Sequence, residues 1–329
     1  TDLPIHQVPI PSFLSGADLK LGLMHKLKRV IYSCSLARTL QTLLRQEEEC
    51  PVLHFHNQYN LFFFLLLTAP HLRRKALIAY TVHSGIWRQD WREIRHTVRR
   101  RYFQERFCMK HCDLLFVLNR ETEETALTHL NVPPRRIVRT CNGIDPLIYR
   151  PLEKNRTMLV LQVGSVCENK GQLRSARLLL PLLQKYPELN FCYAGGIVEE
   201  AYQDAILTFA QKYGLEDQIR YLGMIPPGKS LNELYNRAVF TLFPSAFEAF
   251  GLAAVESLAA GTPVLIPEDS PLDFGCGCIC YREDSFAEIA EKLLVQDNSS
   301  LRTATSSHAV RSYCWDKAAN DHLAAFKER

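Results

Sequence analysis

The sequence predicts an α/β protein built from two Rossmann-like domains. Three observations predict it: short apolar runs alternate with helical patterns along the chain, the chain has 329 residues, and its two halves differ in charge. Alternating strands and helices are typical of βαβ units around a parallel sheet. A chain of 329 residues corresponds to about two domains of roughly 150 residues each. We therefore expect two parallel sheets, one in each half.

The first half contains three apolar runs that we interpret as buried strands. They cover residues 51–56, 76–83 and 113–118. Short apolar runs of this kind suit strands that are covered on both faces, as in parallel sheets. The second half repeats the pattern more regularly, with strands expected at residues 157–163, 190–194, 219–222, 240–243 and 263–266, and helices at 172–185, 199–213, 231–237 and 249–260.

A polar stretch at residues 148–156 marks the boundary between the two domains. It contains Pro151 and precedes a new strand–loop–helix unit. The charge also divides near this point. Residues 1–150 carry 22 Lys and Arg against 13 Asp and Glu, whereas residues 151–329 carry 17 against 22, for net charges of +9 and −5. The difference indicates that the first domain faces an anionic partner, although a chance drift of surface charge is the alternative.

The composition excludes several classes of protein. With 47% hydrophobic and 22% charged residues, the chain is neither disordered nor a collagen-like repeat. Its 11 cysteines are odd in number and scattered, which favours thiols in a reducing compartment over a disulfide framework. No apolar run approaches the roughly 20 residues that span a bilayer. We expect a cytoplasmic protein.

The most informative segment covers residues 243–264, where a strand, a short loop and a helix follow one another. A helix start offers unpaired backbone N–H groups and the positive end of the helix dipole, so it can hold a phosphate. Gly251 lets a ligand approach the backbone closely. Glu248 in the loop and Glu256 in the second helical turn could accept hydrogen bonds from sugar hydroxyls. An ordinary surface pair of glutamates is the alternative.

This segment resembles the E-x7-E region of glycosyltransferase family 4, whose members are retaining enzymes of the GT-B fold. Four further segments match the family's motifs in the same order and extend the resemblance over most of the chain. They are Val163 to Gly171, Asn142 to Pro151 with Tyr149, Tyr221 to Ser245, and Ser312 to Trp315.

The resemblance implies roles for individual residues on the donor side. Glu256 would hold the nucleotide ribose, and Glu248 would contact hydroxyls of the donor sugar. Lys170 would neutralise the diphosphate. Further donor-binding residues would be Gly164, Ser165, Met224, Ile225, Phe250, Gly251 and Leu252, of which Met224 and Ile225 flank the base and the last three offer backbone amides.

His83 matches the position of a family histidine that faces the donor sugar, so we expect catalytic roles for His83 and Glu248. By itself, His83 is better explained as a hydrogen-bonded histidine at a strand end. The resemblance also implies a domain plan: residues 1–150 on the acceptor side, residues 151–305 binding the donor, and a C-terminal helix at residues 306–329 that packs back on the first domain.

Two features depart from the family's pattern. Ser165 stands where the family has an arginine for the diphosphate, which leaves Lys170 as the cation of this loop. The chain also begins beyond the family's first strand and Gly-rich loop, so we expect the first domain to be short at its N-terminus. This departure bears on the acceptor side of the site.

The sequence contains no D-x-D pair, the usual carboxylate clamp for a divalent metal. We expect no metal requirement and no cofactor, with Lys170 and a helix start stabilising the departing nucleoside diphosphate. The resemblance implies retaining transfer of a hexose-type sugar from a UDP- or GDP-sugar to a lipid-linked or cell-surface glycan, without a protein nucleophile. Alternatives are a nucleotide-sugar 2-epimerase or phosphorylase on the same fold, and a degenerate nucleotide-sugar-binding subunit.

A basic and aromatic segment supplies much of the first domain's positive charge. It suits anionic lipid headgroups at the inner membrane face or a phosphorylated acceptor. A solvated helix with inward-facing tryptophans is the alternative, and nucleic-acid binding is disfavoured because the second half is acidic. The residues of this patch are Trp87, Arg88, Trp91, Arg92, Arg95, Arg99, Arg100 and Arg101.

Two other clusters favour structure over metal binding. Cys276, Cys278 and Cys280 alternate along an expected strand without a second C-x-x-C pair, so we interpret them as core residues. His54 and His56 alternate on a strand without an acidic or cysteine partner nearby in the sequence. They are expected to line a site or to support the fold.

Overall fold

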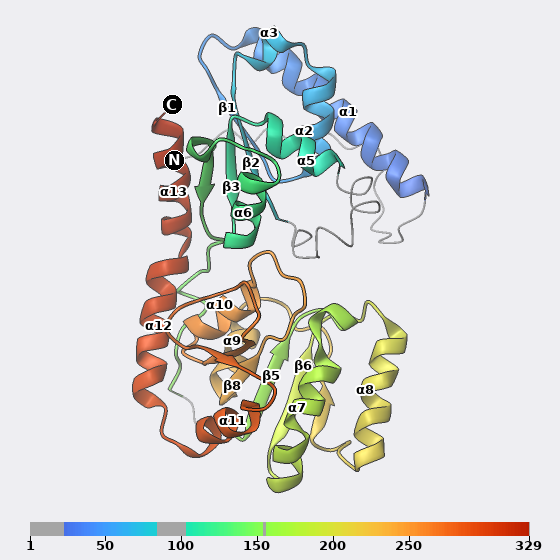
Figure 1. The fold of residues 1–329 in the computed structure, drawn as a ribbon, viewed down its shortest axis with the longest axis vertical. Coiled ribbons are helices and arrows are strands. Elements are labelled where there is room, and N and C mark those ends of the chain that lie inside the picture. The colour runs from blue at the N-terminus through green and yellow to red at the C-terminus, as the bar shows by residue number, and fades with distance from the viewer. Residues whose placement is uncertain (1–22, 84–102, 154–155, 329) are drawn as a thin grey trace. The chain divides into compact units, whose positions relative to one another are not determined.

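The computed structural model describes residues 23–83, 103–153 and 156–328. Within these ranges the chain forms two compact units (Figure 1). Unit 1 combines Thr1–Thr140 with Leu323–Arg329, and unit 2 covers Cys141–His322. Each unit contains a sheet whose strands all run parallel, so the predicted fold class is confirmed.

Unit 1 has a four-stranded sheet in the order β1-β2-β3-β4. The order follows the sequence, and β4 is a short strand that the sequence patterns did not reveal. Its strands are β1 (Val52–Phe55), β2 (Leu77–Thr81), β3 (Leu114–Val117) and β4 (Ile137–Arg139), and its helices are α1 (Leu23–Gln46), α2 (Gln58–Leu67), α3 (Pro70–Arg73), α5 (Phe103–His111) and α6 (Arg120–Thr128).

Side-chain caps fix where two helices of unit 1 begin. The Asn57 side chain accepts a hydrogen bond from the backbone N–H of Tyr59 at 2.9 Å and so starts α2 directly after β1. Asn119 does the same for α6 through the N–H of Thr122 at 2.7 Å. Such caps satisfy N–H groups that have no partner within the helix. Both helices therefore start at the carboxyl end of a strand.

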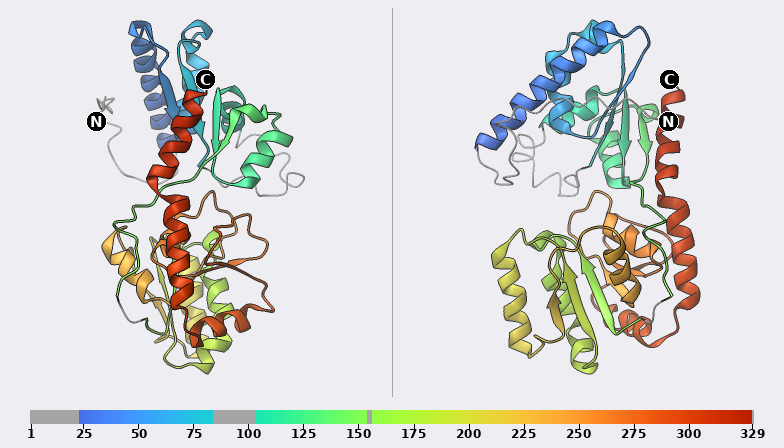
Figure 2. Two further views of the ribbon diagram at one scale, coloured as in Figure 1. Left: turned by 90° about the vertical axis from the view of Figure 1, so that its left-hand side faces the viewer. Right: turned by 180° about the vertical axis from the view of Figure 1, so that it is seen from behind.

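The sheet of unit 1 is covered on both faces. Helices α1, α2 and α5 contribute Leu44, Phe64 and Met109 to a core against one face. The last turns of α13 (Trp315–Lys327) cover the other face (Figure 2). The rings of Phe326 and Phe116 lie 5.7 Å apart there. Residues 323–329 are thus part of unit 1, and burial of these rings removes apolar surface from water.

Unit 2 has a six-stranded sheet in the order β10-β9-β8-β5-β6-β7. Its strands are β5 (Leu159–Val163), β6 (Asn190–Ala194), β7 (Ile219–Tyr221), β8 (Phe240–Leu242), β9 (Val264–Pro267) and β10 (Cys278–Tyr281). Its helices are α7 (Gln172–Lys185), α8 (Glu200–Tyr213), α9 (Lys229–Arg237), α10 (Leu252–Ala259), α11 (Phe286–Val295) and α12 (Ser299–Tyr313), with the first part of α13.

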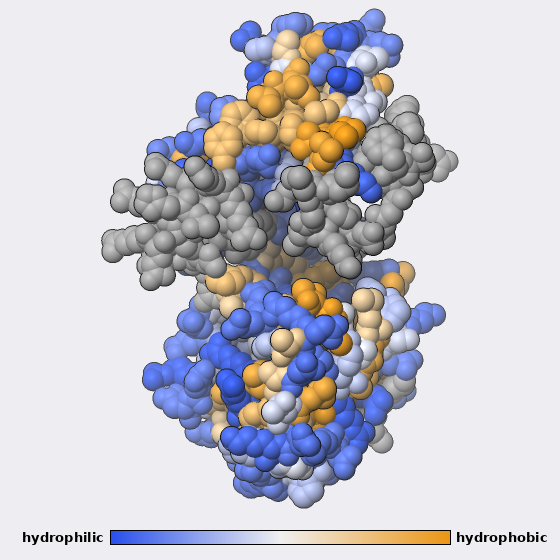
Figure 3. Space-filling view, turned by 90° about the vertical axis from the view of Figure 1, so that its right-hand side faces the viewer, coloured by the Kyte–Doolittle hydropathy of each residue, from blue (hydrophilic) through white to orange (hydrophobic). Residues whose placement is uncertain are grey.

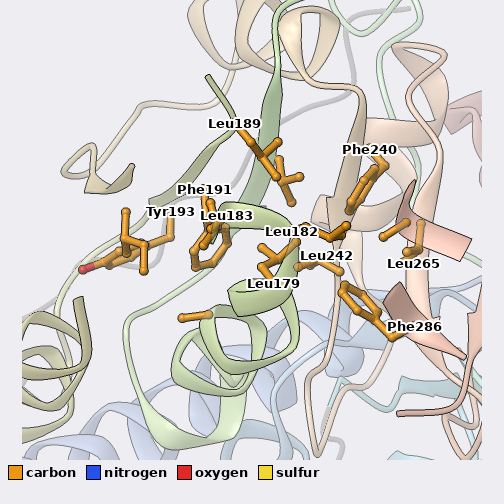
Figure 4. Close-up of a cluster of buried hydrophobic side chains, with 14 of the residues drawn as sticks. Leu179, Leu182, Leu183, Leu189, Phe191, Tyr193, Phe240, Leu242, Leu265 and Phe286 are labelled. Atoms are coloured by element: carbon orange, nitrogen blue, oxygen red, sulfur yellow. The ribbon is translucent and has the colours of Figure 1, made fainter. Parts of the chain in front are cut away.

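The core of unit 2 forms where α7 packs against the sheet. Leu179, Leu182 and Leu183 of α7 lie against Phe191 of β6 and Phe240 of β8 (Figure 4). The apolar residues of α7 recur at intervals of three and four, which places them on one face of the helix. The strands are buried because helices cover them, which explains why they were visible in the sequence as short apolar runs.

Two segments that are far apart in the sequence meet beside this sheet. The backbone N–H of Ile144 donates to the carbonyl of Tyr313 at 2.8 Å, and Ile144 pairs with Cys314 in a parallel bridge. A side chain at Gly143 would collide with the ring of Trp315. Only glycine fits there, which gives a physical reason for the Asn142–Gly143 and Tyr313–Trp315 patterns noted in the sequence.

Candidate active site

The order of strands in unit 2 places its candidate site. From β5 the chain proceeds to β6 and β7 on one side, whereas β8, β9 and β10 extend the sheet on the other. β5 and β8 are neighbours at this switch point, and the carboxyl ends of their strands open toward the same edge. Open α/β sheets bind ligands at this place. The two loops concerned are residues 164–171 and residues 243–251.

Glycines shape the loop after β5, and two buried glutamine side chains hold it in place. Gly171 has φ +74° and connects a short turn to the start of α7. The Gln162 side chain donates to the carbonyl of Lys170 at 2.7 Å, and the Gln172 side chain donates to the carbonyl of Ser165 at 2.9 Å. Both glutamines are buried, so the loop has a fixed backbone on which Ser165 is exposed.

The structure brings together two residues that the sequence singled out separately. The Lys170 ammonium forms an ion pair with the Glu248 carboxylate, and both side chains are about one-fifth exposed (22% and 20%). Lys170 also lies 5.8 Å from the centre of the Phe243 ring. Partial burial reduces solvent screening of such a pair. Lys170 and Glu248 therefore form an ion pair between the loops that follow β5 and β8.

The helix after β8 begins later than expected from the sequence. It starts at Leu252, not near residues 249–250, because Gly251 has φ +86° and ends the preceding loop. A side chain at Gly251 would lie 2.9 Å from the Phe274 ring. Within the described residues, the backbone N–H groups of Phe250, Gly251 and Leu252 have no hydrogen-bond acceptor. These groups and the dipole of α10 offer partial positive charge next to Lys170 and Glu248.

Glu256 lies in the second turn of α10 and is 7% exposed. The Tyr235 hydroxyl donates to its carboxylate at 3.1 Å, and the Tyr149 hydroxyl also interacts with it. Burial raises the pKa of Glu256, and the two tyrosine hydroxyls oppose that rise. The Tyr149 hydroxyl also accepts from the backbone N–H of Gly228 at 3.2 Å. Glu256 is therefore a preoriented carboxylate, not a free surface residue.

If Glu256 holds the ribose as the sequence resemblance implies, Glu256→Gln should weaken binding of UDP or GDP about 10- to 100-fold, because charge-assisted hydrogen bonds to the ribose hydroxyls would be lost. The melting temperature should stay equal or rise. Because the pKa of Glu256 is raised in the folded protein, protonated Glu256 stabilises the fold more than charged Glu256 does. This extra stability is present at pH below the ordinary carboxyl pKa and is lost as the pH rises through the raised pKa. Gln removes that unfavourable buried charge at neutral pH.

Calorimetric titration and thermal melting at pH 7.5 measure the two effects of Glu256→Gln. A melting temperature lower by more than about 5 °C with unchanged nucleotide affinity would assign Glu256 a structural role only.

The residues expected to flank the base lie after β7. Met224 is 74% exposed, and Ile225 beside it is half-buried. The loop after β6 approaches closely, since a side chain at Gly196 would lie 3.1 Å from the Met224 methyl group. The Tyr221 hydroxyl donates to the carbonyl of Gly195 at 2.7 Å. Met224 thus forms an accessible apolar surface on the same carboxyl edge of the sheet.

Unit 1 has a cavity of about 350 Å³ at the carboxyl ends of β1 and β2. His56 and His83 share a hydrogen bond of 2.9 Å between Nδ1 and Nε2. Burial, and then the charge of His56, lower the pKa of His83. A lowered pKa favours the neutral, hydrogen-bonding form of the His83 ring. The wall combines aromatic and polar side chains, among them Arg29, Tyr32, His56, Asn57, Tyr59 and His83.

The two histidines of the His54–Phe55–His56 run have different surroundings. The Nε2 atom of His54 lies 2.7 Å from the Thr81 hydroxyl, and its ring contacts Phe116 and Phe326. His56 instead lines the cavity. The basic and aromatic patch at residues 87–101 lies outside the described residues.

Sequence reasoning missed several residues that support the site. Gln162 was detectable, because it is a polar residue within an otherwise apolar strand. Tyr235 and Asn169 carry no such pattern. Their contacts join segments 21 and 78 residues apart, so only the folded chain reveals them.

Comparison with known proteins agrees with this geometry. Residues 10–146 match the family described as Glycosyltransferase Family 4, and residues 148–272 match Glycosyl transferases group 1. The fold and the matched family define a glycosyltransferase of the GT-B fold, in the hexosyltransferase class. The chain belongs to glycosyltransferase family 4.

Individual relatives are distant. A GDP-mannose:cellobiosyl-diphosphopolyprenol alpha-mannosyltransferase from Xanthomonas oryzae is 27% identical over 316 residues, covering 92% of this chain and 80% of the relative. A D-inositol 3-phosphate glycosyltransferase from Corynebacterium aurimucosum is 27% identical over 240 residues, covering 65% of this chain and 56% of the relative.

Solved structures share the fold at low sequence identity. A sucrose-phosphate synthase from Thermosynechococcus elongatus has a TM-score of 0.72 at 18% identity and covers 92% of this chain and 79% of its own. The Anabaena protein HepE in complex with UDP has a TM-score of 0.72 at 14% identity and covers 90% of this chain and 82% of its own.

Proposed function

We propose that this protein is a retaining, metal-independent transferase that moves a hexose-type sugar from a UDP- or GDP-sugar to a lipid-linked or cell-surface glycan. The observation that supports it most is the convergence of Lys170, Glu248 and the open amides of residues 250–252 at the switch point of unit 2. The relatives named for GDP-mannose and a diphosphopolyprenol-linked acceptor agree with this class of donor and acceptor.

The donor's diphosphate would lie at the start of α10. Lys170 and the amides of Phe250, Gly251 and Leu252 would bind its oxygens, and charge that develops on the leaving phosphate would meet fixed positive charge. Because Lys170 is paired with Glu248, a diphosphate bound to Lys170 would compete with this ion pair. Glu248 would then be released to accept hydrogen bonds from hydroxyls of the sugar.

The nucleoside would extend from the diphosphate across the same edge of the sheet. Glu256, already oriented by Tyr149 and Tyr235, would accept hydrogen bonds from the ribose hydroxyls. The exposed Met224 with Ile225 would flank the base. Carboxylate and apolar surface are what a ribose and a base respectively require.

The acceptor would bind unit 1 in the cavity that His56 and His83 line. Its aromatic and amide side chains suit the hydroxyls and apolar faces of a sugar. In the transfer step, the bond from the anomeric carbon to the diphosphate oxygen breaks as the acceptor oxygen bonds to that carbon on the same face. The acceptor's hydroxyl proton passes to the leaving phosphate. Neutral His83 would hydrogen-bond the reacting sugar without adding charge.

Association with an anionic membrane at the cytoplasmic face is part of the proposal. Among the described residues, no helix is both long and apolar enough to cross a membrane. Hydrophobic side chains gather on the face of unit 1 that α1, α2 and α5 form (Figure 3). Leu27, Ile31, Leu66, Leu67 and Phe103 are exposed members of these helices. An exposed apolar surface of this kind suits peripheral binding to a membrane.

Transfer assays with UDP-glucose, UDP-N-acetylglucosamine and GDP-mannose test this function. The acceptors are polyprenyl-diphosphate oligosaccharides in vesicles of either neutral or anionic phospholipid. We expect one donor to give a retained, α-configured product, faster on anionic vesicles, and we expect EDTA to change the rate less than 2-fold. Loss of activity in EDTA that Mg²⁺ restores would contradict the roles of Lys170 and α10. Donor isomerisation without an acceptor would identify an epimerase instead.

A further inference from the structure

One asparagine joins the two loops of the candidate donor site. The Asn169 side chain accepts a hydrogen bond from the backbone N–H of Phe247 at 3.0 Å and donates to the carbonyl of Phe247 at 3.2 Å. The carbonyl of Asn169 accepts from the N–H of Ala246 at 2.9 Å. These three hydrogen bonds, which we call the Asn169 latch, connect the loop after β5 to the loop after β8.

The latch acts at the residues next to the charged pair. Asn169 directly precedes Lys170, and Phe247 directly precedes Glu248. Fixing Asn169 against Phe247 therefore fixes the spacing between the ammonium and the carboxylate that follow them. The loops also touch nearby, since a side chain at Gly171 would lie 3.2 Å from the Pro244 ring.

We propose that Asn169 is a positioning residue for sugar transfer, holding Glu248 and the start of α10 in register with Lys170. The inference rests on the proposed donor site. Asn is suited to the task because one side-chain amide accepts and donates at once, matching the backbone N–H and the carbonyl of the single residue Phe247. Asp has no donor for the Phe247 carbonyl, and Ala has neither group.

The latch is independent of the groups that bind the nucleoside. Glu256 is oriented by Tyr149 and Tyr235, and among the described residues no hydrogen bond joins either tyrosine to Asn169. Loss of the latch should therefore reduce turnover, while Glu256 keeps its orientation. A shift of about 1 Å in a positioned group lowers rates on the order of 100-fold. We expect Asn169→Ala to lower kcat about 30-fold, somewhat less than that.

A double-mutant cycle separates positioning from general support of the fold. Asn169→Ala, Glu248→Gln and the double variant are compared with the native protein in kcat for hydrolysis of the better of UDP-glucose and GDP-mannose. If Asn169 acts through Glu248, Asn169→Ala should lower kcat less than about 3-fold in the Glu248→Gln background, because effects of coupled residues do not multiply. Equal effects in both backgrounds would overturn the inference.

Hydrogen exchange provides a readout that does not depend on activity. In the native protein, the amides of Ala246 and Phe247 donate to Asn169 and should be protected. A peptide covering residues 243–251 should exchange faster in Asn169→Ala and, if that variant folds poorly, in Asn169→Ser. Unchanged exchange in both variants would overturn the latch.

Asn190→Ala is the matched control. Asn190 also donates its side-chain amide to a backbone carbonyl, that of Glu188 at 2.9 Å, but it lies at the start of β6. It should leave both exchange of residues 243–251 and kcat within 2-fold of native. If Glu248→Gln alone retains native activity, the proposed donor site fails; if Glu248→Gln is impaired and Asn169→Ala is not, only the latch fails.

Discussion

Glu248→Gln is expected to lower turnover about 100- to 1,000-fold, the usual effect of removing one group that stabilises a transition state. Binding of UDP or GDP should stay equal or become tighter. The reason is the ion pair: Glu248 would compete with the diphosphate for the Lys170 ammonium, and Gln removes that competition. Steady-state rates and calorimetric titration of the nucleoside diphosphate measure the two effects.

A second glutamate–lysine pair provides the control for Glu248→Gln. Glu291 accepts a hydrogen bond from Lys185 at 2.5 Å on the surface of the same unit. Glu291→Gln should leave both turnover and nucleotide binding within 2-fold of native. Turnover by Glu248→Gln close to that of the native protein would remove Glu248 from the reaction.

Lys170→Met is expected to weaken binding of UDP or GDP and to lower turnover about 100-fold or more, because it removes the charge proposed to face the leaving phosphate. The loops at residues 164–171 and 243–251 contain no other Lys or Arg, and Ser165 supplies none. The same substitution also leaves Glu248 partly buried without its partner, facing the diphosphate as an uncompensated negative charge.

Two further variants separate these effects of Lys170. Lys170→Arg keeps the positive charge and should retain part of the activity, although a guanidinium differs from an ammonium in shape. The double variant Lys170→Met with Glu248→Gln should bind nucleoside diphosphate better than Lys170→Met alone. Lys185→Met is the matched surface control and should resemble the native protein. Native nucleotide affinity in Lys170→Met would contradict the assigned role.

The fold could be predicted largely because its strands are buried on both faces. β6 is the clearest example: the apolar run at residues 190–194 coincides with the strand. α7 also has the expected bounds, residues 172–185, because its apolar face has a strong helical period. β4 was missed because three residues are too few to show a period. The start of α10 was misplaced because Gly251, not a polar cap, ends the preceding loop.

The sequence could predict which residues belong to the candidate site, but not the contacts between them. The sequence singled out Lys170 and Glu248 through their resemblance to family motifs, but not that they pair across 78 residues. Their pairing follows from the neighbouring positions of β5 and β8, which is a property of sheet order. The contacts of Glu256 with Tyr149 and Tyr235 were equally invisible. They depend on how α9 and the segment before β5 pack beside α10.

The most direct test of the central claim is a crystal structure with UDP or GDP bound. The account predicts phosphate oxygens within hydrogen-bond distance of the Lys170 ammonium and of the backbone N–H groups of Phe250, Gly251 and Leu252, with the ribose hydroxyls on Glu256. A nucleotide bound elsewhere on the chain, or one whose phosphates contact neither Lys170 nor the start of α10, would contradict it.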